Sequence, residues 1–272
     1  KKDHIKLAFD SKLASSDIRK GLEYEPMLAV HPSESDFLKE FDFLGKKMKF
    51  PLWISSMTGG TKWAETINRN LAKACGEFGL GMGLGSCRIL LEDSSRFEDF
   101  NVRQYMTEDC PLYINFGIAQ VEEMRSKGSL EQIEELNSKL RSDGLIIHVN
   151  PLQEWVQEEG DEITVPPLET VKEVLEILDM PVIVKEVGQG FGPRSMKALM
   201  KLPLEAIDFA AAGGTNFSRL EMLRKRDKLK SEDEAISHLG HTAEQMLEYA
   251  RNIYDKNEEL QVKQFIISGG VK

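Results

Sequence analysis

The stretch that decides the fold is LIIHVNPLQE, from Leu145 to Glu154. It opens with apolar residues that are typical of a buried strand, and polar residues follow directly. His148 and Asn150 are two positions apart, so they point to the same face of a strand. Gln153 and Glu154 come next, on the loop that leaves the strand. Because α/β proteins place their chemistry at the carboxyl ends of strands, we expect a binding site here.

Each of these residues also has an ordinary structural explanation when it is taken alone. His148 could be a hydrogen-bonded core histidine, and Gln153 and Glu154 could be solvated loop residues. Their occurrence together, after a strand too apolar for the surface, favours a binding site.

Apolar strands alternate with amphipathic helices along the whole chain. The predicted strands are PLWIS (51–55), GLGMGLGS (79–86), LYINF (112–116), LIIHVN (145–150), VIVKEV (182–187), AIDFAAA (206–212) and QFIISGG (264–270). Two alternating runs about Gly45 predict a hairpin over 41–50. Ser129 with Gln132, and Thr242 with Gln245, have the spacing of capping boxes that begin helices. Repeated strand–helix units require parallel strands with right-handed crossovers.

A closed barrel fits this pattern better than an open sheet, because polar or small residues lie at or just past the carboxyl ends of most of the strands. They are Ser56, Ser86, Asn115, His148, Lys185, Thr215 and Gly269. A barrel brings such strand ends to one mouth, and 272 residues are close to the roughly 250 that one barrel needs. We therefore predict an α/β fold, a TIM (β/α)8 barrel, as a single domain over 1–272 with an amino-terminal segment of about residues 1–40. The eighth βα unit is missing from the chain, so we expect further residues in the natural protein.

Composition and charge exclude several classes of protein. A net charge of −10 argues against a nucleic-acid partner. No apolar run approaches the roughly 20 residues that cross a bilayer, and the charged start KKDHIKLAFDSK lacks a signal-peptide core, so we expect no membrane association and a cytoplasmic location. The three cysteines, Cys75, Cys87 and Cys110, have no metal-binding spacing and are expected to be reduced thiols without a role.

Glycine clusters and one lysine complete the candidate site. MTGGT (57–61), GGT (213–215) and SGG (268–270) could bind an anion through backbone N–H groups, or could simply form tight turns. Lys185 lies within an apolar strand, where an unpaired ammonium is costly, so it should point into the barrel mouth towards negative charge. Glu186 should face outward, towards an ion pair with the helix layer.

Taken together, these motifs resemble those of type 2 isopentenyl diphosphate isomerases, the flavin-dependent enzymes that interconvert isopentenyl and dimethylallyl diphosphates. The resemblance runs in order through KKDH, SSMTGGT, GLGMGLGSCR, NFG, HVNPLQE, VKEVG, GGTNF and SGGVK, and it covers nearly the whole chain. HVNPLQE with VKEVG is specific, whereas the glycine clusters alone are not. The resemblance implies an enzyme of isoprenoid biosynthesis, an isomerase that moves a carbon–carbon double bond.

The resemblance also implies cofactors, partners and roles for residues. It implies FMN at the barrel mouth, Mg²⁺ beside the substrate diphosphate, NADPH as the reductant of the flavin, and a homo-oligomer, a tetramer or octamer. The implied FMN-binding residues are Ser56, Met57, Thr58, Ser86, Asn115, Lys185, Thr215, Gly269 and Gly270. The implied substrate-binding residues are Lys1, His4, Ser86, Arg88, His148, Asn150 and Gln153. Gln153, His148 and Lys185 take the catalytic positions, and Glu154 takes the metal position.

The chemistry explains why these residue types are needed. Moving the double bond requires protonation of an unactivated alkene and removal of a different proton, and a reduced flavin could serve as acid, base and cation stabiliser. Glu154 is a hard oxygen donor that suits Mg²⁺ shared with phosphate oxygens. His148 and Arg88 are expected to offset the remaining diphosphate charge. Gln153 is a poor acid and is expected to assist.

The chain departs from the family pattern in three places. The arginine expected before Lys1 is absent, Ala210 and Ala211 replace a serine and a glycine of many relatives, and the loop after strand eight is absent.

Two rival functions are considered. One rival is an FMN-dependent 2-hydroxy acid oxidase, which needs a histidine base with arginines near the seventh strand. His241 has no arginine near it in the sequence and is expected to be a loop residue. The other rival is a non-catalytic barrel that binds a phosphate ligand.

Overall fold

The computed structural model of the chain describes residues 2–8, 10–17, 26–27, 30–31, 33, 40–56, 58–224, 235–256, 259–262 and 264–270. The chain divides into two compact units, Lys1–Lys39 and Glu40–Lys272. The first contains α1 (Lys2–Leu7) and the 3₁₀ helix η1 (Ser15–Asp17). Large apolar side chains such as Ile5, Leu13 and Val30 are exposed in this unit, so its described residues bury no hydrophobic core.

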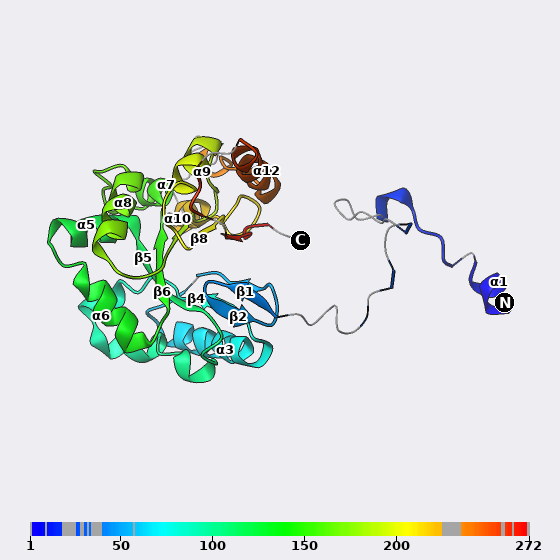
Figure 1. The fold of residues 1–272 in the computed structure, drawn as a ribbon, viewed down its shortest axis with the longest axis horizontal. Helices are drawn as coiled ribbons and strands as arrows, with labels where there is room; N and C mark the ends of the chain where they lie inside the picture. Colours follow the sequence, from blue (N-terminus) through cyan, green and yellow to red (C-terminus); the bar gives the residue numbers. More distant parts are fainter. Residues whose placement is uncertain are drawn as a thin grey trace. The chain divides into compact units, whose positions relative to one another are not determined.

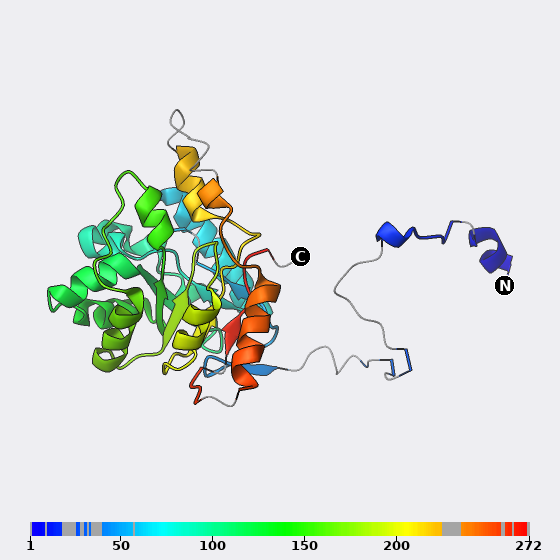
Figure 2. The same cartoon turned by 90° about the horizontal axis from the view of Figure 1, so that it is seen from above.

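The second unit contains the predicted parallel strands. They are β3 (Trp53–Ile54), β4 (Gly81–Gly83), β5 (Leu112–Gly117), β6 (Gly144–His148), β7 (Val182–Lys185), β8 (Ala206–Asp208) and β9 (Phe265–Ile266). Each strand pairs in parallel with the next one along the chain, in a single sheet of seven. Figure 1 shows the strands in the middle of the unit with helices around them, and Figure 2 shows the same arrangement from above. The predicted TIM-barrel fold is confirmed as a nearly closed barrel.

Helices follow the strands and cover the outside of the sheet. They are α3 (Lys62–Phe78), α4 (Ile89–Glu92), α5 (Ile118–Ser126), α6 (Glu131–Leu140), α7 (Pro151–Val156), α8 (Pro167–Ile177), α9 (Pro193–Leu199), α10 (Phe217–Arg224) and α12 (Ala243–Tyr254), with short 3₁₀ helices η2 (Ser94–Asp99) and η3 (Arg103–Tyr105). In the part of the chain that the structure describes, no helix is long and apolar enough to cross a membrane.

Alternation along the strands separates two hydrophobic clusters. The residues that face the helices form the larger cluster, whereas Tyr113, Ile146, Ile183, Ala206 and Ile266 face inward and form the smaller one. In β5, β6, β7 and β8, the next residue on the same face is polar: Asn115, His148, Lys185 and Asp208. The inward apolar side chains thus leave the carboxyl ends of these strands to polar residues.

The predicted hairpin is confirmed and lies against the amino-terminal end of the barrel. Its strands are β1 (Phe41–Phe43) and β2 (Lys46–Met48), which pair antiparallel. The two turn residues, Leu44 and Gly45, have positive φ angles of 52° and 70°, as type I′ turns require. The Leu44 side chain joins the inward cluster, and its N–H donates to Gln264 Oε1 at 2.9 Å. The turn therefore closes the floor of the barrel.

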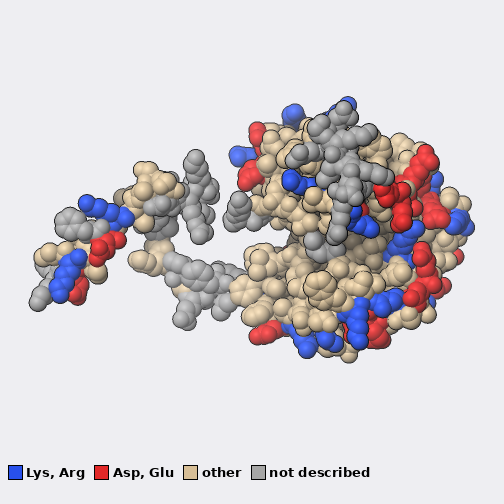
Figure 3. All heavy atoms as spheres, turned by 180° about the vertical axis from the view of Figure 1, so that it is seen from behind, with Lys and Arg blue, Asp and Glu red and all other residues tan. Residues whose placement is uncertain are grey.

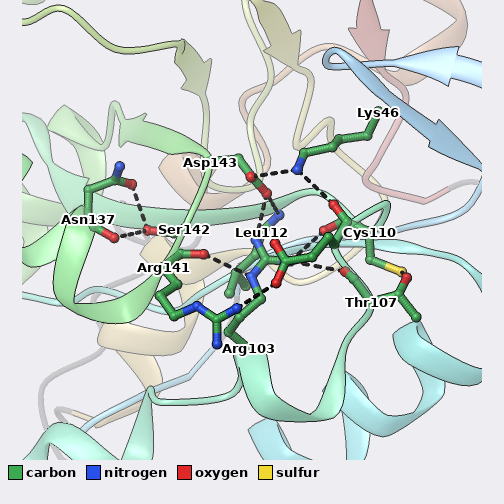
Figure 4. A network of polar contacts seen from close by, with 10 residues as sticks. Lys46, Arg103, Thr107, Cys110, Leu112, Asn137, Arg141, Ser142 and Asp143 are labelled. Carbon is green, nitrogen blue, oxygen red and sulfur yellow. Dashed lines mark hydrogen bonds and ion pairs between the residues drawn. The ribbon is translucent and has the colours of Figure 1, made fainter.

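A buried arginine joins several elements at this same end of the barrel (Figure 4). The guanidinium of Arg103 donates to Asp143 Oδ2 at 2.6 Å and to the carbonyl oxygens of Cys110 and Arg141, both at 2.8 Å. Asp143 also pairs with Lys46 of the hairpin at 3.0 Å and accepts the N–H of Leu112. The network ties the hairpin to the starts of β5 and β6.

One of the two predicted capping boxes is wrong. The hydroxyl of Ser129 donates to the carbonyl of Met124 at 3.3 Å, which leaves α6 to begin after Leu130 without a side-chain cap. The box at α12 is confirmed, because Thr242 Oγ1 accepts the N–H of Gln245 and Gln245 Oε1 accepts the N–H of Thr242. Helix spacing alone does not distinguish the two sites.

Candidate functional site

A ring of polar side chains lies above the apolar interior, at the carboxyl ends of the strands. Pairing places His148 of β6 opposite Lys185 of β7, and Lys185 opposite Asp208 of β8. Asn115 lies two residues beyond the inward-facing Tyr113 on β5, and therefore on the same face. Asn115, Lys185 and Asp208 are all less than 5% exposed. The barrel thus brings together side chains that are far apart in the sequence.

Lys185 and Asp208 form the charged centre of this ring. Asp208 is fully buried, and its carboxylate accepts hydrogen bonds from the hydroxyls of Ser55, at 3.1 Å, and Ser268. Burial lowers the pKa of Lys185 and raises that of Asp208, and the attraction between the two groups opposes both shifts. Lys185 also donates to the carbonyl of Glu186 at 2.7 Å. The expectation that Lys185 faces negative charge in the mouth agrees with this geometry.

His148 is held as a neutral imidazole in this ring. Its Nδ1 lies 2.9 Å from Oδ1 of Asn115, which favours the tautomer that donates from Nδ1 and leaves Nε2 as an acceptor. Burial lowers the pKa of His148 to about 3, with a further contribution from the Lys185 cation. Near pH 7 the imidazole therefore offers hydrogen bonds rather than the positive charge expected from the sequence.

A second polar cluster follows β6 and begins at Asn150, which is buried. Asn150 Nδ2 donates to Glu154 Oε1 at 2.7 Å and to Gln153 Oε1 at 3.3 Å, while Asn150 Oδ1 has no hydrogen-bond partner. Glu154 Oε2 accepts the N–H of Asp161 at 2.9 Å. Gln153 and Glu154 lie on the short helix α7 and not on a loop as predicted, and Asn150 directly precedes this helix, so an amide, a carboxylate and an unused acceptor lie close together.

Arg88, which follows β4, joins this cluster through Asp161. Its Nη1 donates to Asp161 Oδ2 at 2.6 Å, and its Nε lies 3.5 Å from Glu92. Although burial alone would lower the pKa of Arg88, the carboxylates of Asp161 and Glu92 raise it, so the guanidinium stays charged. The expected substrate residues Arg88, Asn150 and Gln153 are therefore linked, together with Glu154.

The loops after β3 and β4 lie against each other and carry further expected residues. Ser56 Oγ is buried without a hydrogen-bond partner. A Cβ on Gly85 would lie 2.1 Å from the carbonyl oxygen of Thr58, so these two loops touch through their backbones. Ser86 Oγ accepts the N–H of Arg88 at 3.5 Å.

The glycine loops after β8 and β9 also pack backbone against backbone. A Cβ on Gly214 would lie 3.1 Å from the Cα of Gly269, and one on Gly269 would lie 2.2 Å from the carbonyl oxygen of Ala211. Thr215 follows Gly214 and is exposed. Gly269 and Gly270 therefore lie beside the GGT loop.

The structure does not place three of the expected residues at this site. Lys1 and Met57 lie outside the described residues. His4 is exposed on α1, in the amino-terminal unit.

Sequence reasoning missed several residues of the site. Asp208, Ser55, Ser268, Gln120 and Asp161 were not expected there. The argument applied to Lys185, that a charge within an apolar strand needs a partner, would have found Asp208 in AIDFAAA. No local pattern marks Asp161, because its partners are distant in the sequence.

The predicted ion pair between Glu186 and the helix layer is wrong. The side chain is 7% exposed, and its Oε2 accepts three backbone N–H groups, from Gly188, Gln189 and Gly190. It therefore shapes the loop after β7 instead of pairing with a helix.

The cysteines are buried thiols, as expected. Burial raises the pKa of Cys75 and Cys87 to about 12, which makes both poor nucleophiles.

Comparison with solved structures finds low similarity to flavoenzymes. A mandelate oxidase mutant is 13% identical with a TM-score of 0.43, covering 66% of this chain and 52% of that one. An old yellow enzyme homologue from Zymomonas mobilis is 10% identical with a TM-score of 0.45, covering 63% and 72%. No protein-family model matches the chain.

Similarity to curated proteins is much stronger. Proteins named isopentenyl-diphosphate delta-isomerase are 41% identical over 230 residues in Deinococcus radiodurans and 36% identical over 241 residues in Methanosarcina barkeri. The matches cover 85% and 88% of this chain, and the chain spans 64% of the length of each relative. The protein of the same name in Rickettsia prowazekii is 36% identical over 236 residues, which cover 85% of this chain and 67% of that relative. The chain therefore belongs to the isopentenyl-diphosphate delta-isomerase family.

Proposed function

We propose that the chain converts isopentenyl diphosphate to dimethylallyl diphosphate at the mouth of its barrel, with FMN and Mg²⁺. One observation carries the proposal. A charged arginine and a carboxylate suited to a metal lie in one hydrogen-bonded cluster, next to a ring that holds a neutral imidazole and a buried lysine. The arginine and the metal-binding carboxylate suit a diphosphate. The ring with the imidazole and the lysine offers the water-poor, polar surface that suits an alkene which gains and loses protons.

The residues present fit an FMN at this mouth. Ser56 Oγ is a buried hydroxyl without a partner, and the two glycine loops form a backbone surface suited to a phosphate. We propose that Ser56, Met57, Thr58, Ser86, Asn115, Lys185, Thr215, Gly269 and Gly270 hold the cofactor. When bound in reduced form, FMN supplies an electron-rich ring that can exchange a proton.

The chain's own residues would orient the substrate and control its protons. Lys185, kept near Asp208, supplies positive charge in the mouth. His148 is positioned by Asn115, which leaves Nε2 free to accept a hydrogen bond. Gln153 is fixed through Asn150 and can hold a proton on its amide, though not as a strong acid. These three remain the proposed catalytic residues.

Binding of the diphosphate is assigned to the cluster around α7. Arg88 offers a guanidinium that can donate to phosphate oxygens, and Asn150 offers a short polar side chain. Glu154 would take Mg²⁺ through an oxygen ligand, since a protein often supplies only one or two carboxylates when phosphates complete the coordination. Lys1 and His4 remain proposed substrate residues. NADPH as reductant and a tetramer or octamer belong to the same proposal.

The oxidase alternative has less support in the geometry. Nδ1 of His241 lies 3.1 Å from the hydroxyl of Tyr249, and the two rings meet edge to face. His241 is thus engaged with α12, and among the described residues no arginine forms a hydrogen bond with it.

The proposal is tested by changing Glu154→Gln and following conversion of isopentenyl diphosphate while Mg²⁺ is varied. We expect the variant to keep FMN, which is measured by its absorbance, and to need at least tenfold more Mg²⁺ for half-maximal activity. Glu162→Gln, an exposed carboxylate in the same loop region, serves as the control. An unchanged magnesium response in Glu154→Gln would remove the metal role of this residue.

A further inference from the structure

Asp161 lies in the loop between α7 and α8 and contacts both parts of the proposed diphosphate site. Its Oδ2 accepts Nη1 of Arg88 at 2.6 Å and Nε2 of Gln120 at 2.7 Å. Its backbone N–H donates to Glu154 Oε2 at 2.9 Å. A single residue therefore links the proposed anion-binding arginine to the proposed metal ligand.

Residues of α5 form hydrogen bonds with Asp161 and with the loop that carries it. Gln120 is 7% exposed, and its Oε1 accepts the N–H of Gly117 at the end of β5, at 3.1 Å. Three residues beyond Asp161, the N–H and hydroxyl of Thr164 both donate to Glu122 Oε1. Two anchors on one helix thus fix the position of the Asp161 carboxylate relative to the barrel.

Arg88 depends on this carboxylate for its orientation. The arginine side chain is 44% exposed, and its other acidic partner, Glu92, is 64% exposed and more distant at 3.5 Å. Exposed pairs of that kind contribute little. The charge-assisted bond to Asp161, whose side chain is 36% exposed, is shorter at 2.6 Å. Among the described residues, Nη2 of Arg88 has no hydrogen-bond partner, which leaves that nitrogen for a ligand.

We propose that Asp161 is a positioning residue for diphosphate binding, which fixes the guanidinium of Arg88 beside Glu154. The inference rests on the proposed function and extends it to a residue that does not itself bind the ligand. The carboxylate is negative and would repel a diphosphate if it lay against it. Its benefit must therefore come from orienting Arg88, which restricts a flexible side chain before the ligand arrives.

The test is the affinity of the whole chain for inorganic diphosphate with Mg²⁺, measured by calorimetry. We expect Asp161→Asn to weaken binding about tenfold, because the amide keeps the shape but loses the charge-assisted bond. Arg88→Met should weaken it further, and the double variant should bind no worse than Arg88→Met alone. Asp109→Asn removes one exposed negative charge before β5 and should leave affinity unchanged.

Kinetics separate positioning from a general loss of structure. In Asp161→Asn, KM for isopentenyl diphosphate should rise about tenfold while kcat stays within about twofold, because only binding is affected. Should that variant not fold, Gln120→Leu removes a donor that holds the carboxylate and is expected to weaken diphosphate binding in the same direction.

Several outcomes would overturn the inference. Tighter binding in Asp161→Asn would mean that the carboxylate competes with diphosphate for Arg88. Losses that add in the double variant would mean that Asp161 acts independently of Arg88. Normal binding in Asp161→Asn, with a wild-type site that depends on Arg88, would overturn the inference alone. A wild-type chain that does not bind diphosphate would overturn the proposed function as well.

Discussion

His148 shows how the environment of one residue decides its chemistry. Its folded-state pKa of about 3 lies below the ordinary value of 6.5, because burial and the nearby Lys185 cation disfavour the imidazolium. A group with a lowered pKa contributes stability that is present above the unfolded pKa. That contribution is lost as pH falls from 6.5 towards 3.

We predict that His148→Gln makes the protein less sensitive to acid. Between pH 7.5 and 5.0, the free energy of unfolding should fall by roughly 1–2 kcal/mol more in the wild type than in the variant, a value reduced for partial exposure. Urea unfolding at the two pH values measures it. His238→Gln alters an exposed histidine and should show the wild-type dependence. Equal acid sensitivity in His148→Gln and wild type would contradict the neutral state of His148.

At the scale of single residues, the sequence predicted the site residues that can be recognised from their neighbours in the chain. Lys185 stands out because a cation in an apolar strand needs a partner, and Asn115 and His148 are polar residues near the carboxyl ends of apolar strands. Asp208 could have been predicted by the same reasoning. Asp161 and Gln120 could not, because their roles depend on loops that meet only in the folded barrel.

At the scale of elements, the glycine loops after β8 and β9 are the proposed binding surface for the FMN phosphate. Gly269 has a φ of +87°, and a Cβ there would lie 2.2 Å from a backbone oxygen. We predict that Gly269→Ala weakens FMN binding more than tenfold, measured by fluorescence titration. Gly128→Ala is a matched control, because Gly128 also has a positive φ, +65°, but has open space around it. Equal FMN affinity in the two variants would contradict the role of the loop.

The Arg103 network is expected to stabilise the floor of the barrel without affecting the chemistry (Figure 4). The Arg103 side chain is 1% exposed, so Arg103→Met leaves Asp143 without its buried partner. We predict a loss of about 3–5 kcal/mol in the free energy of unfolding, measured with urea. Arg141→Met breaks only an exposed pair with Glu108 and should cost less than about 1 kcal/mol. Similar losses in both variants would contradict the structural role of Arg103.

The order and type of the elements could be predicted, but their ends could not. All seven strands were expected. Six of them are shorter than predicted, whereas β5 extends one residue further, to Gly117, because strand pairing and not the apolar run sets where a strand ends. The capping boxes at Ser129 and Thr242 have the same spacing, and only the second forms. At Ser129 a nearby carbonyl competes for the hydroxyl.

At the scale of the whole molecule, the two units differ in what holds them together. Glu40–Lys272 contains both hydrophobic clusters, whereas the described residues of Lys1–Lys39 contribute to neither. Because the hydrophobic clusters lie entirely in the second unit, folding of the barrel should not require the first unit.

On the face of the molecule drawn in Figure 3, Lys and Arg are interspersed with Asp and Glu, without a continuous basic patch.

We predict that removal of residues 1–39 leaves the unfolding temperature of the barrel within about 2 °C. If Lys1 and His4 bind the substrate as proposed, KM for isopentenyl diphosphate should rise at least tenfold. Circular dichroism on heating and steady-state kinetics measure the two effects. A barrel that no longer folds would contradict the independence of its core, and an unchanged KM would remove Lys1 and His4 from the site.

The central claim is that this barrel mouth isomerises isopentenyl diphosphate. The most direct measurement is anaerobic proton NMR of isopentenyl diphosphate in D₂O with the chain, FMN, Mg²⁺ and NADPH, omitting each in turn. We predict dimethylallyl diphosphate that carries solvent deuterium, and its loss when FMN or Mg²⁺ is withheld. Unchanged isopentenyl diphosphate, from a chain shown to hold reduced FMN and to bind diphosphate, would contradict the account.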